Sequence, residues 1–413
     1  MFKRFFLALV LLCAALQLPA QDPAAMIRKD YSRMGANYHN YELPKDPVAQ
    51  APAGYEPFYI SHYGRHGSRY LTYESSYTMS IDALERLDAG GLLKPKGRKL
   101  LKMLQQAYDL SKDRIGRLSP KGIMEHRGIA SRMYDRFPEV FVAGARIDAV
   151  SSTSRRCKTS MVSFLEALSV KESSLDINMD ASKEHMSYML NHGDESFHSV
   201  VKHYIDSLNH AIFNPEALLT PLVKDYGKAA VLLGDPVVFE RKLYDCVAIS
   251  QCLPDKYDIL WAIPYGEGVK LWSLKNKQQY LYHGNSAPYG HIRLPASRPL
   301  AEDIVKRADK AIAKGYPAVS LRFGHDSALF ALEAYMGVSG FEQCLAADQT
   351  DLWQNFRLMC MGSNIQLVFY RNVSGDVLVR ILQNERDAFI PALGPGPFYP
   401  WPVLRGHLLR EKL

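Results

Sequence analysis

The sequence of 413 residues contains only six cysteines, and no two of them form a CxxC pair. A zinc site built from paired cysteines is therefore not expected, and no metal or organic cofactor is predicted. Cys13 lies within the first twenty residues, which leaves five cysteines further along the chain. An odd number implies at least one free thiol, unless one cysteine pairs between chains. Cys246 and Cys252 are near in sequence and export would permit a disulfide between them, but spacing alone does not establish one.

Long hydrophobic runs are also missing, apart from one at the amino terminus. Lys3 and Arg4 precede an apolar run over 5–16, and a small residue, Ala20, closes the following Leu-Pro-Ala. This pattern predicts a secretory signal peptide over 1–20, too short to span a membrane comfortably. No later segment is long and apolar enough for a span, so we expect an exported protein, periplasmic or secreted.

The charge is modest and evenly spread. The formal net charge is +7, and removal of Lys3 and Arg4 lowers it by two. No run of basic residues is interleaved with aromatic ones, so a nucleic-acid partner is not expected. The excess suits a small anionic ligand. With 47% hydrophobic residues and no internal repeat, the chain is typical of a large globular protein, which we expect to be monomeric.

The most informative segment follows the first predicted strand, over 55–62. There the chain reads Gly64-Arg65-His66-Gly67-Ser68-Arg69. Arginines at the exit of a strand, with glycines that let the backbone approach closely, are what a phosphate-binding site needs. The histidine between them can act as a base or a nucleophile.

Two further predicted strands end in the same way. The strand over 143–151 is followed by Ser154, Arg155 and Arg156 and then a helical run over 159–168. The strand over 318–323 is followed by His325, Asp326 and a helix through residue 335. In an open α/β sheet, ligands bind outside the carboxyl ends of the strands, where helix amino termini add positive potential. We therefore expect Arg65, His66, Arg69, Arg156 and His325 to converge on one pocket.

The remaining pattern completes an α/β fold: a mainly parallel central sheet flanked by helices, with an inserted, mostly helical cap. Strands are predicted over 365–370 and 376–382, and helices within 80–110 and from Ser119, a plausible N-cap before a proline. The predicted core comprises 21–165 and 276–413, its first part up to residue 54 being a polar leader that wraps the core. The predicted cap covers 166–275.

These groups suit phosphoryl transfer. The reaction needs donors for the phosphoryl oxygens, an in-line nucleophile and a proton for the leaving alkoxide. Arg65, Arg69 and Arg156 can supply the donors. The arginines favour an unprotonated His66 that can attack phosphorus, and Asp326 can supply the proton.

Arg65-His66-Gly67-Ser68-Arg69 resembles the RHGxR signature of the histidine phosphatases, in the acid phosphatase and phytase branch. The resemblance implies a phosphohistidine intermediate on His66, with Arg65 and Arg69 as phosphate ligands. It also assigns the third arginine to Arg156 rather than Arg155, because Ser160 follows four residues later. The late His-Asp pair maps to His325, a phosphate donor, and Asp326, the proton donor.

A narrower resemblance is to the multiple inositol polyphosphate phosphatases. It rests on the segment 54–70, with Tyr70 after the second arginine, and on the carboxyl-terminal segments 363–371, 384–385 and 398–401. It covers roughly 35–165 and 315–405 and is weak in the cap. One departure is that members commonly carry His-Ala-Glu where this chain has His325-Asp326-Ser327, which puts the proton donor on a shorter side chain.

The resemblance implies a phosphomonoesterase acting on inositol polyphosphates, including inositol hexakisphosphate. Lys183 and Lys202 are candidate contacts from the cap to such a ligand. Three alternatives remain: a broad acid phosphatase for sugar phosphates, a phosphomutase and a catalytically silent anion-binding protein. Export argues against the mutase, whose substrates are cytosolic. The complete set of His66, three arginines and Asp326 argues against the silent protein.

Overall fold

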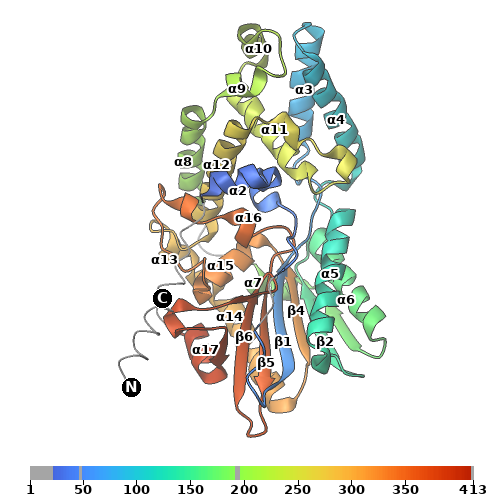
Figure 1. Ribbon diagram of the computed structural model, residues 1–413, viewed down its shortest axis with the longest axis vertical. Coiled ribbons are helices and arrows are strands. Elements are labelled where there is room, and N and C mark those ends of the chain that lie inside the picture. Colours follow the sequence, from blue (N-terminus) through green and yellow to red (C-terminus); the bar gives the residue numbers. More distant parts are fainter. Residues whose placement is uncertain (1–21, 46–48, 191–195, 411–413) are drawn as a thin grey trace.

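The computed structural model describes residues 22–45, 49–190 and 196–410, so the predicted signal peptide lies outside the described residues. Two parts are visible, an α/β part around a central sheet and a helical part above it (Figure 1). None of the helices within the described ranges combines the length and the apolar character that a membrane crossing needs.

The central sheet is mixed, with the strand order β3-β2-β4-β1-β5-β6-β7 and β8 paired to β6. The strands β3, β2, β4 and β1 are parallel to one another, and the strands from β5 onward pair antiparallel. The strands are β1 Glu56–Arg65, β2 Arg146–Ser151, β3 Asp176–Asp180, β4 Val319–Gly324, β5 Asn364–Arg371, β6 Val377–Gln383, β7 Arg386–Ala388 and β8 Phe398–Pro400. The five predicted strands are all present, and the α/β fold is confirmed.

Helices cover both faces of the sheet (Figure 1). Alternate residues of β1 divide between the faces, because side chains of a strand point in opposite directions in turn. Ile60 packs with α5 and α6 on one face, whereas Tyr59 and Tyr63 pack with α14, α15 and α17 on the other. The helices of this part are α5 Pro120–Arg136, α6 Arg155–Lys171, α7 Met186–Met189, α13 Gly290–Arg293, α14 Arg298–Lys314, α15 Asp326–Met336 and α17 Trp401–Leu408. The short helix α16 Asn355–Leu358 contacts both parts, because Phe356 belongs to the core of the helical part and Leu358 packs against the core beside the sheet.

The helical part has its own hydrophobic core, to which distant segments contribute. Leu84 and Leu100, which fall within the segment 21–165 predicted for the α/β core, are buried in the helical part together with Val201, Leu243 and Leu271. The helices are α2 Pro23–Lys29, α3 Ser75–Ala89, α4 Pro95–Ser111, α8 Ser196–Ile212, α9 Pro215–Leu219, α10 Tyr226–Leu233, α11 Pro236–Ser250 and α12 Tyr265–His283. The predicted cap over 166–275 thus differs from this unit: α3 and α4 join it, whereas β3 lies in the central sheet.

Local signals in the sequence explain where the helices beside the site begin. The Ser119 hydroxyl accepts a hydrogen bond from the Gly122 amide at 3.4 Å, and Pro120 occupies the first turn of α5, as predicted.

All five cysteines among the described residues are free thiols, so Cys246 and Cys252 are not joined.

Candidate functional site

The predicted site residues meet at one edge of the sheet. Parallel pairing sets Arg65 of β1 opposite Gly324 of β4, so the residues that follow the two strands lie side by side. The His66 amide donates to the Gly324 carbonyl at 3.0 Å, and the Ser152 amide after β2 donates to Phe323 at 2.9 Å. Three loops that are separated by up to about 260 residues are therefore fixed to one another by backbone hydrogen bonds.

His66 is buried, with its ring held in a defined orientation. Its Nδ1 lies 2.9 Å from the Gly67 carbonyl oxygen. Because a carbonyl only accepts, Nδ1 carries the proton and Nε2 keeps its lone pair. Burial, followed by the charges of Arg156, Arg65 and Arg69, holds the pKa of His66 well below its ordinary value. The ring is therefore neutral, and Nε2 is available as a nucleophile.

The loop that carries His66 passes close to helix α5. A Cβ on Gly67 would lie 2.7 Å from the Gly122 carbonyl oxygen, and a Cβ on Gly122 would lie 2.2 Å from that of Ser68. Both positions therefore need glycine. The Glu125 carboxylate accepts hydrogen bonds from the Ser68 amide at 2.7 Å and from its hydroxyl at 2.6 Å. Glu125, which the sequence analysis missed, thus fixes this loop.

Arg65 and Arg69 are both buried beside His66. Arg65 is 1% exposed and donates through Nη1 to the carbonyls of Asn37 at 2.6 Å and Met359 at 2.8 Å. Arg69 donates to the Tyr70 carbonyl at 3.0 Å, and its guanidinium carbon lies 5.3 Å from the centre of the Tyr38 ring. These contacts fix the guanidinium groups, so little reorganisation is needed to bind an anion.

Arg156 and His325 close the other side of the site. The Arg156 guanidinium donates to His325 Nδ1 at 3.2 Å, which places the ring proton on Nε2, 3.2 Å from the Ser152 hydroxyl. Burial, followed by the charge of Arg156, lowers the pKa of His325 to about 4. The two histidine rings lie 5.7 Å apart, centre to centre. Arg155 is exposed and does not take part in this group.

Asp326 begins helix α15 next to Arg65. One carboxylate oxygen lies 3.0 Å from Arg65 and accepts a hydrogen bond from the Asn37 side chain at 2.7 Å. Burial on its own raises the pKa of Asp326, but Arg65 and its other cationic and hydrogen-bonding neighbours outweigh burial and hold it well below the usual range. Asp326 is therefore a carboxylate in this state, and it needs a change of surroundings before it can act as an acid.

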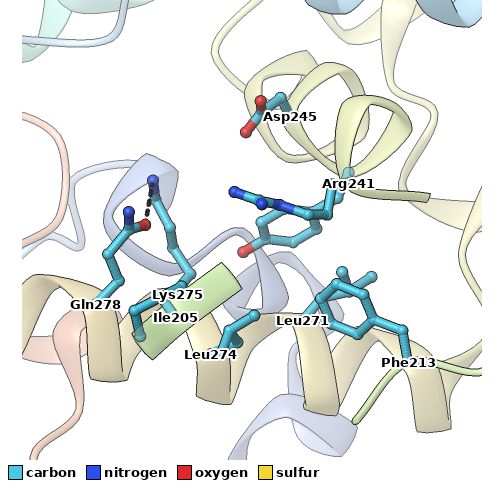
Figure 2. A pocket seen from close by; sticks show the side chains of 9 residues that line it. Ile205, Phe213, Arg241, Asp245, Leu271, Leu274, Lys275 and Gln278 are labelled. Carbon is cyan, nitrogen blue, oxygen red and sulfur yellow. Dashed lines mark hydrogen bonds between the residues drawn. The ribbon is translucent and has the colours of Figure 1, made fainter. Parts of the chain in front are cut away.

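The helical part brings one further cation toward this site. Lys275 of α12 lies 5.9 Å from the centre of the same Tyr38 ring that Arg69 contacts. Figure 2 shows Lys275 and Gln278 at one side of a small cavity of about 50 Å³, with Arg241 opposite.

Of the two lysines proposed as cap contacts, Lys202 is mostly exposed and paired with Asp206 at 2.5 Å. Nothing in the described residues brings Lys183 to the site.

One group of three side chains has donor atoms near enough to hold a metal ion among the described residues: Asp30, His39 and Glu42. The group is already internally bonded. His39 contacts Glu42 at 2.9 Å, and Arg33 donates to Glu42 at 3.0 Å. An arginine that occupies the carboxylates disfavours a cation at the same place, so we assign no metal to this group.

Comparison with known proteins gives a consistent result at the level of the fold. No protein-family model matches the sequence, and no curated protein matches it either. Among solved structures, the multiple inositol polyphosphate phosphatase of Bifidobacterium longum in complex with inositol hexasulfate has a TM-score of 0.74 at 16% identity, over 91% of this chain and 97% of that one. A phytase from D. castellii has a TM-score of 0.66 at 13% identity, over 93% and 87% of the two chains. The Hafnia alvei phytase has a TM-score of 0.56 at 14% identity, over 87% and 97%. These structures come from the group that the sequence motifs indicate, and this chain has their fold.

Proposed function

We propose that this protein is an exported histidine-type phosphatase that hydrolyses inositol polyphosphates, including inositol hexakisphosphate, through a phosphohistidine intermediate. The observation that carries the proposal is a buried, neutral His66 whose Nε2 is free, surrounded by Arg65, Arg69 and Arg156. Support for the substrate class comes from the structural neighbours, which are inositol polyphosphate phosphatases and phytases, one of them bound to inositol hexasulfate.

The first chemical step forms the intermediate. The three arginines and His325 hold the oxygens of one phosphate group, and His66 Nε2 attacks the phosphorus. The bond between phosphorus and the ester oxygen attached to the inositol ring breaks, and Asp326 gives its proton to the departing alkoxide. The hydrogen bond from Nδ1 to the Gly67 carbonyl then stabilises the positive charge on the phosphorylated ring.

The second step releases phosphate. A water molecule attacks the phosphorus and gives a proton to the Asp326 carboxylate, and the bond between phosphorus and Nε2 breaks. His66 recovers its lone pair and inorganic phosphate leaves, after which Asp326 gives up this proton to solvent and returns to the resting carboxylate. No metal or organic cofactor is needed in either step.

The resting charge of Asp326 implies that substrate binding prepares the acid. A phosphate dianion that binds Arg65 offsets the positive charge that holds the pKa of Asp326 down. The pKa then rises, and the carboxyl takes up the proton that the leaving alkoxide needs. Protonation is thereby coupled to occupation of the site.

The alternative of a broad acid phosphatase for sugar phosphates is favoured by one feature, the His325-Asp326 pair in place of His-Ala-Glu. The test is a panel of substrates assayed with purified protein lacking 1–20. We expect kcat/KM to be greater for inositol hexakisphosphate than for simple sugar phosphates. A preference for the sugar phosphates would show that the protein is a broad acid phosphatase instead. Identification of the first product from inositol hexakisphosphate would define the ring position attacked.

Export is the remaining part of the proposal. It rests on the predicted signal peptide, and we expect the protein to be a monomer in the periplasm or outside the cell. Amino-terminal sequencing of protein recovered from cell fractions tests it, with a chain that begins after Ala20 as the expected result. An intact amino terminus in the cytosolic fraction would contradict it.

A further inference from the structure

A second cluster of cations lies beside the candidate site, around a cavity of about 690 Å³. We name it the basic pocket, and its charged residues are Arg114, Arg117, Arg155 and Lys158. All four are exposed, and no acidic residue lines the cavity. The floor includes apolar side chains, among them Leu118 and Ile123.

The charges of the basic pocket have no carboxylate partner within ion-pair distance among residues 22–45, 49–190 and 196–410. Arg114 donates to the Leu110 carbonyl at 3.2 Å and lies 6.0 Å from the centre of the Tyr70 ring. Arg127 of α5, by contrast, pairs with Glu166 of α6 at 2.7 Å. Four like charges that converge without a counter-ion repel one another, and a bound anion relieves that repulsion.

Two helices add to the positive potential. Both α5 and α6 are 17 residues long and begin at the rim of the basic pocket, with Pro120 and Arg155 in their first turns. The amino terminus of a helix carries a partial positive charge and unpaired amide groups. Helix potential and side-chain charge therefore have the same sign here.

A wall of backbone separates the basic pocket from the His66 site. Residues 69–71 pair with 116–118: Arg69 is bridged to Leu118, and the Tyr70 amide donates to the Arg117 carbonyl at 2.9 Å. A Cβ on Gly116 would lie 3.9 Å from the Arg156 guanidinium, whereas the next residue, Arg117, lines the basic pocket. The basic pocket is lined by none of the six residues assigned to the His66 site, which are Arg65, His66, Arg69, Arg156, His325 and Asp326.

We propose that the basic pocket is a second binding site for a small, multiply phosphorylated ligand, separate from the site of hydrolysis. Its volume lies within the range of about 300–1,000 Å³ that is usual for small-molecule sites. The cations match phosphate groups and the apolar floor matches the carbon ring of an inositol phosphate. The choice of inositol polyphosphate as the ligand rests on the proposed function; the presence of an anion site does not.

The test counts binding sites on a protein that cannot turn over its ligand. Inositol hexasulfate is titrated calorimetrically into His66→Ala protein, and we expect two bound molecules. The double substitution Arg117→Ser, Lys158→Ser should weaken one of the two by about a hundredfold, tenfold for each lost charged contact. A control that removes two exposed lysines elsewhere, Lys102→Ser with Lys306→Ser, should leave both sites unchanged.

The same double substitution, Arg117→Ser with Lys158→Ser, is also made in protein that retains His66. Its activity shows whether the substitutions affect folding or catalysis as well as ligand binding. Its kcat with p-nitrophenyl phosphate should equal that of the parent, because the substituted side chains do not contact the His66 site. A single bound molecule in His66→Ala protein, or two that the double substitution leaves intact, would overturn the proposal. Much tighter binding of long-chain inorganic polyphosphate than of inositol hexasulfate would also overturn it, because the ligand would then be a polymer. Failure of the proposed function would be seen separately, as absent turnover with the second site retained.

Discussion

Asp326→Asn is the substitution that separates proton transfer from phosphate binding. It keeps the shape of the side chain and removes the acidic proton. The amide oxygen can still accept from Arg65 and Asn37, which now contact the carboxylate at 3.0 and 2.7 Å. We therefore expect the variant to fold, with little loss of thermal stability.

The expected effect depends on the leaving group. General acid catalysis is worth about 10²- to 10⁴-fold when the leaving group is a poor one, as an inositol alkoxide is. A nitrophenolate leaves without a proton, so kcat for p-nitrophenyl phosphate should fall by much less, about tenfold at most. Arg65 also loses its charged partner in the variant. Inorganic phosphate should therefore inhibit the variant about tenfold more tightly, the difference between a charged and a neutral hydrogen bond.

The assay is steady-state hydrolysis of both substrates, with phosphate inhibition measured alongside. Asp303→Asn is the matched control. Asp303 forms a comparable, partly buried ion pair with Arg322 at an N–O distance of 2.7 Å, and neither residue belongs to the His66 site. The control should lower stability and slow both substrates alike, if at all. Equal slowing of both substrates by Asp326→Asn would show that this residue positions the phosphate or the fold and does not deliver the proton.

Three other predictions follow from the site and its surroundings. With p-nitrophenyl phosphate, Arg156→Ala should lower kcat/KM about 10²- to 10³-fold and Arg155→Ala only about twofold, and equal losses would overturn the assignment. Activity should survive dialysis against a chelator; recovery that depended on added zinc or magnesium would reveal a metal site. Burial lowers the pKa of His62 and His126 to about 3 in the folded protein. The unfolded chain therefore takes up protons below about pH 6.5 that the folded chain excludes, and the free energy of unfolding falls by about 1.4 kcal/mol per pH unit for each histidine down to about pH 3. Denaturant unfolding of His126→Phe between pH 6 and 4 should show a slope smaller by that amount, and an unchanged slope would contradict the assignment.

The convergence of the site was predictable because it depends on few facts. The segments that end at Arg65, Ser151 and Gly324 have the composition of buried strands, and parallel strands present their carboxyl ends at one edge. Residues immediately after such strands must meet, whatever their separation in sequence. The family's spacing of an arginine four residues before a serine, here Ser160, then distinguished Arg156 from Arg155, and the structure places only Arg156 beside His325.

The remaining features depend on contacts that no local pattern contains. Asn37 lies 289 residues from Asp326, in a segment predicted only to wrap the core, and nothing in its neighbourhood marks it as a partner. The charge state of Asp326 depends on that contact and on Arg65. The apolar faces of α3 and α4 resemble those of any amphipathic helix, so the sequence did not show that they join the core of the helical part, with α3 packed against α4 and α11, rather than the sheet.

The central claim is that His66 carries the phosphoryl group during turnover. The direct measurement is rapid acid-free quenching of the enzyme with radiolabelled inositol hexakisphosphate, followed by peptide mapping of the label. We predict one acid-labile, base-stable phosphoryl group on the peptide that contains His66, and none in His66→Ala protein. Turnover without a labelled protein, or label on another residue, would contradict the account.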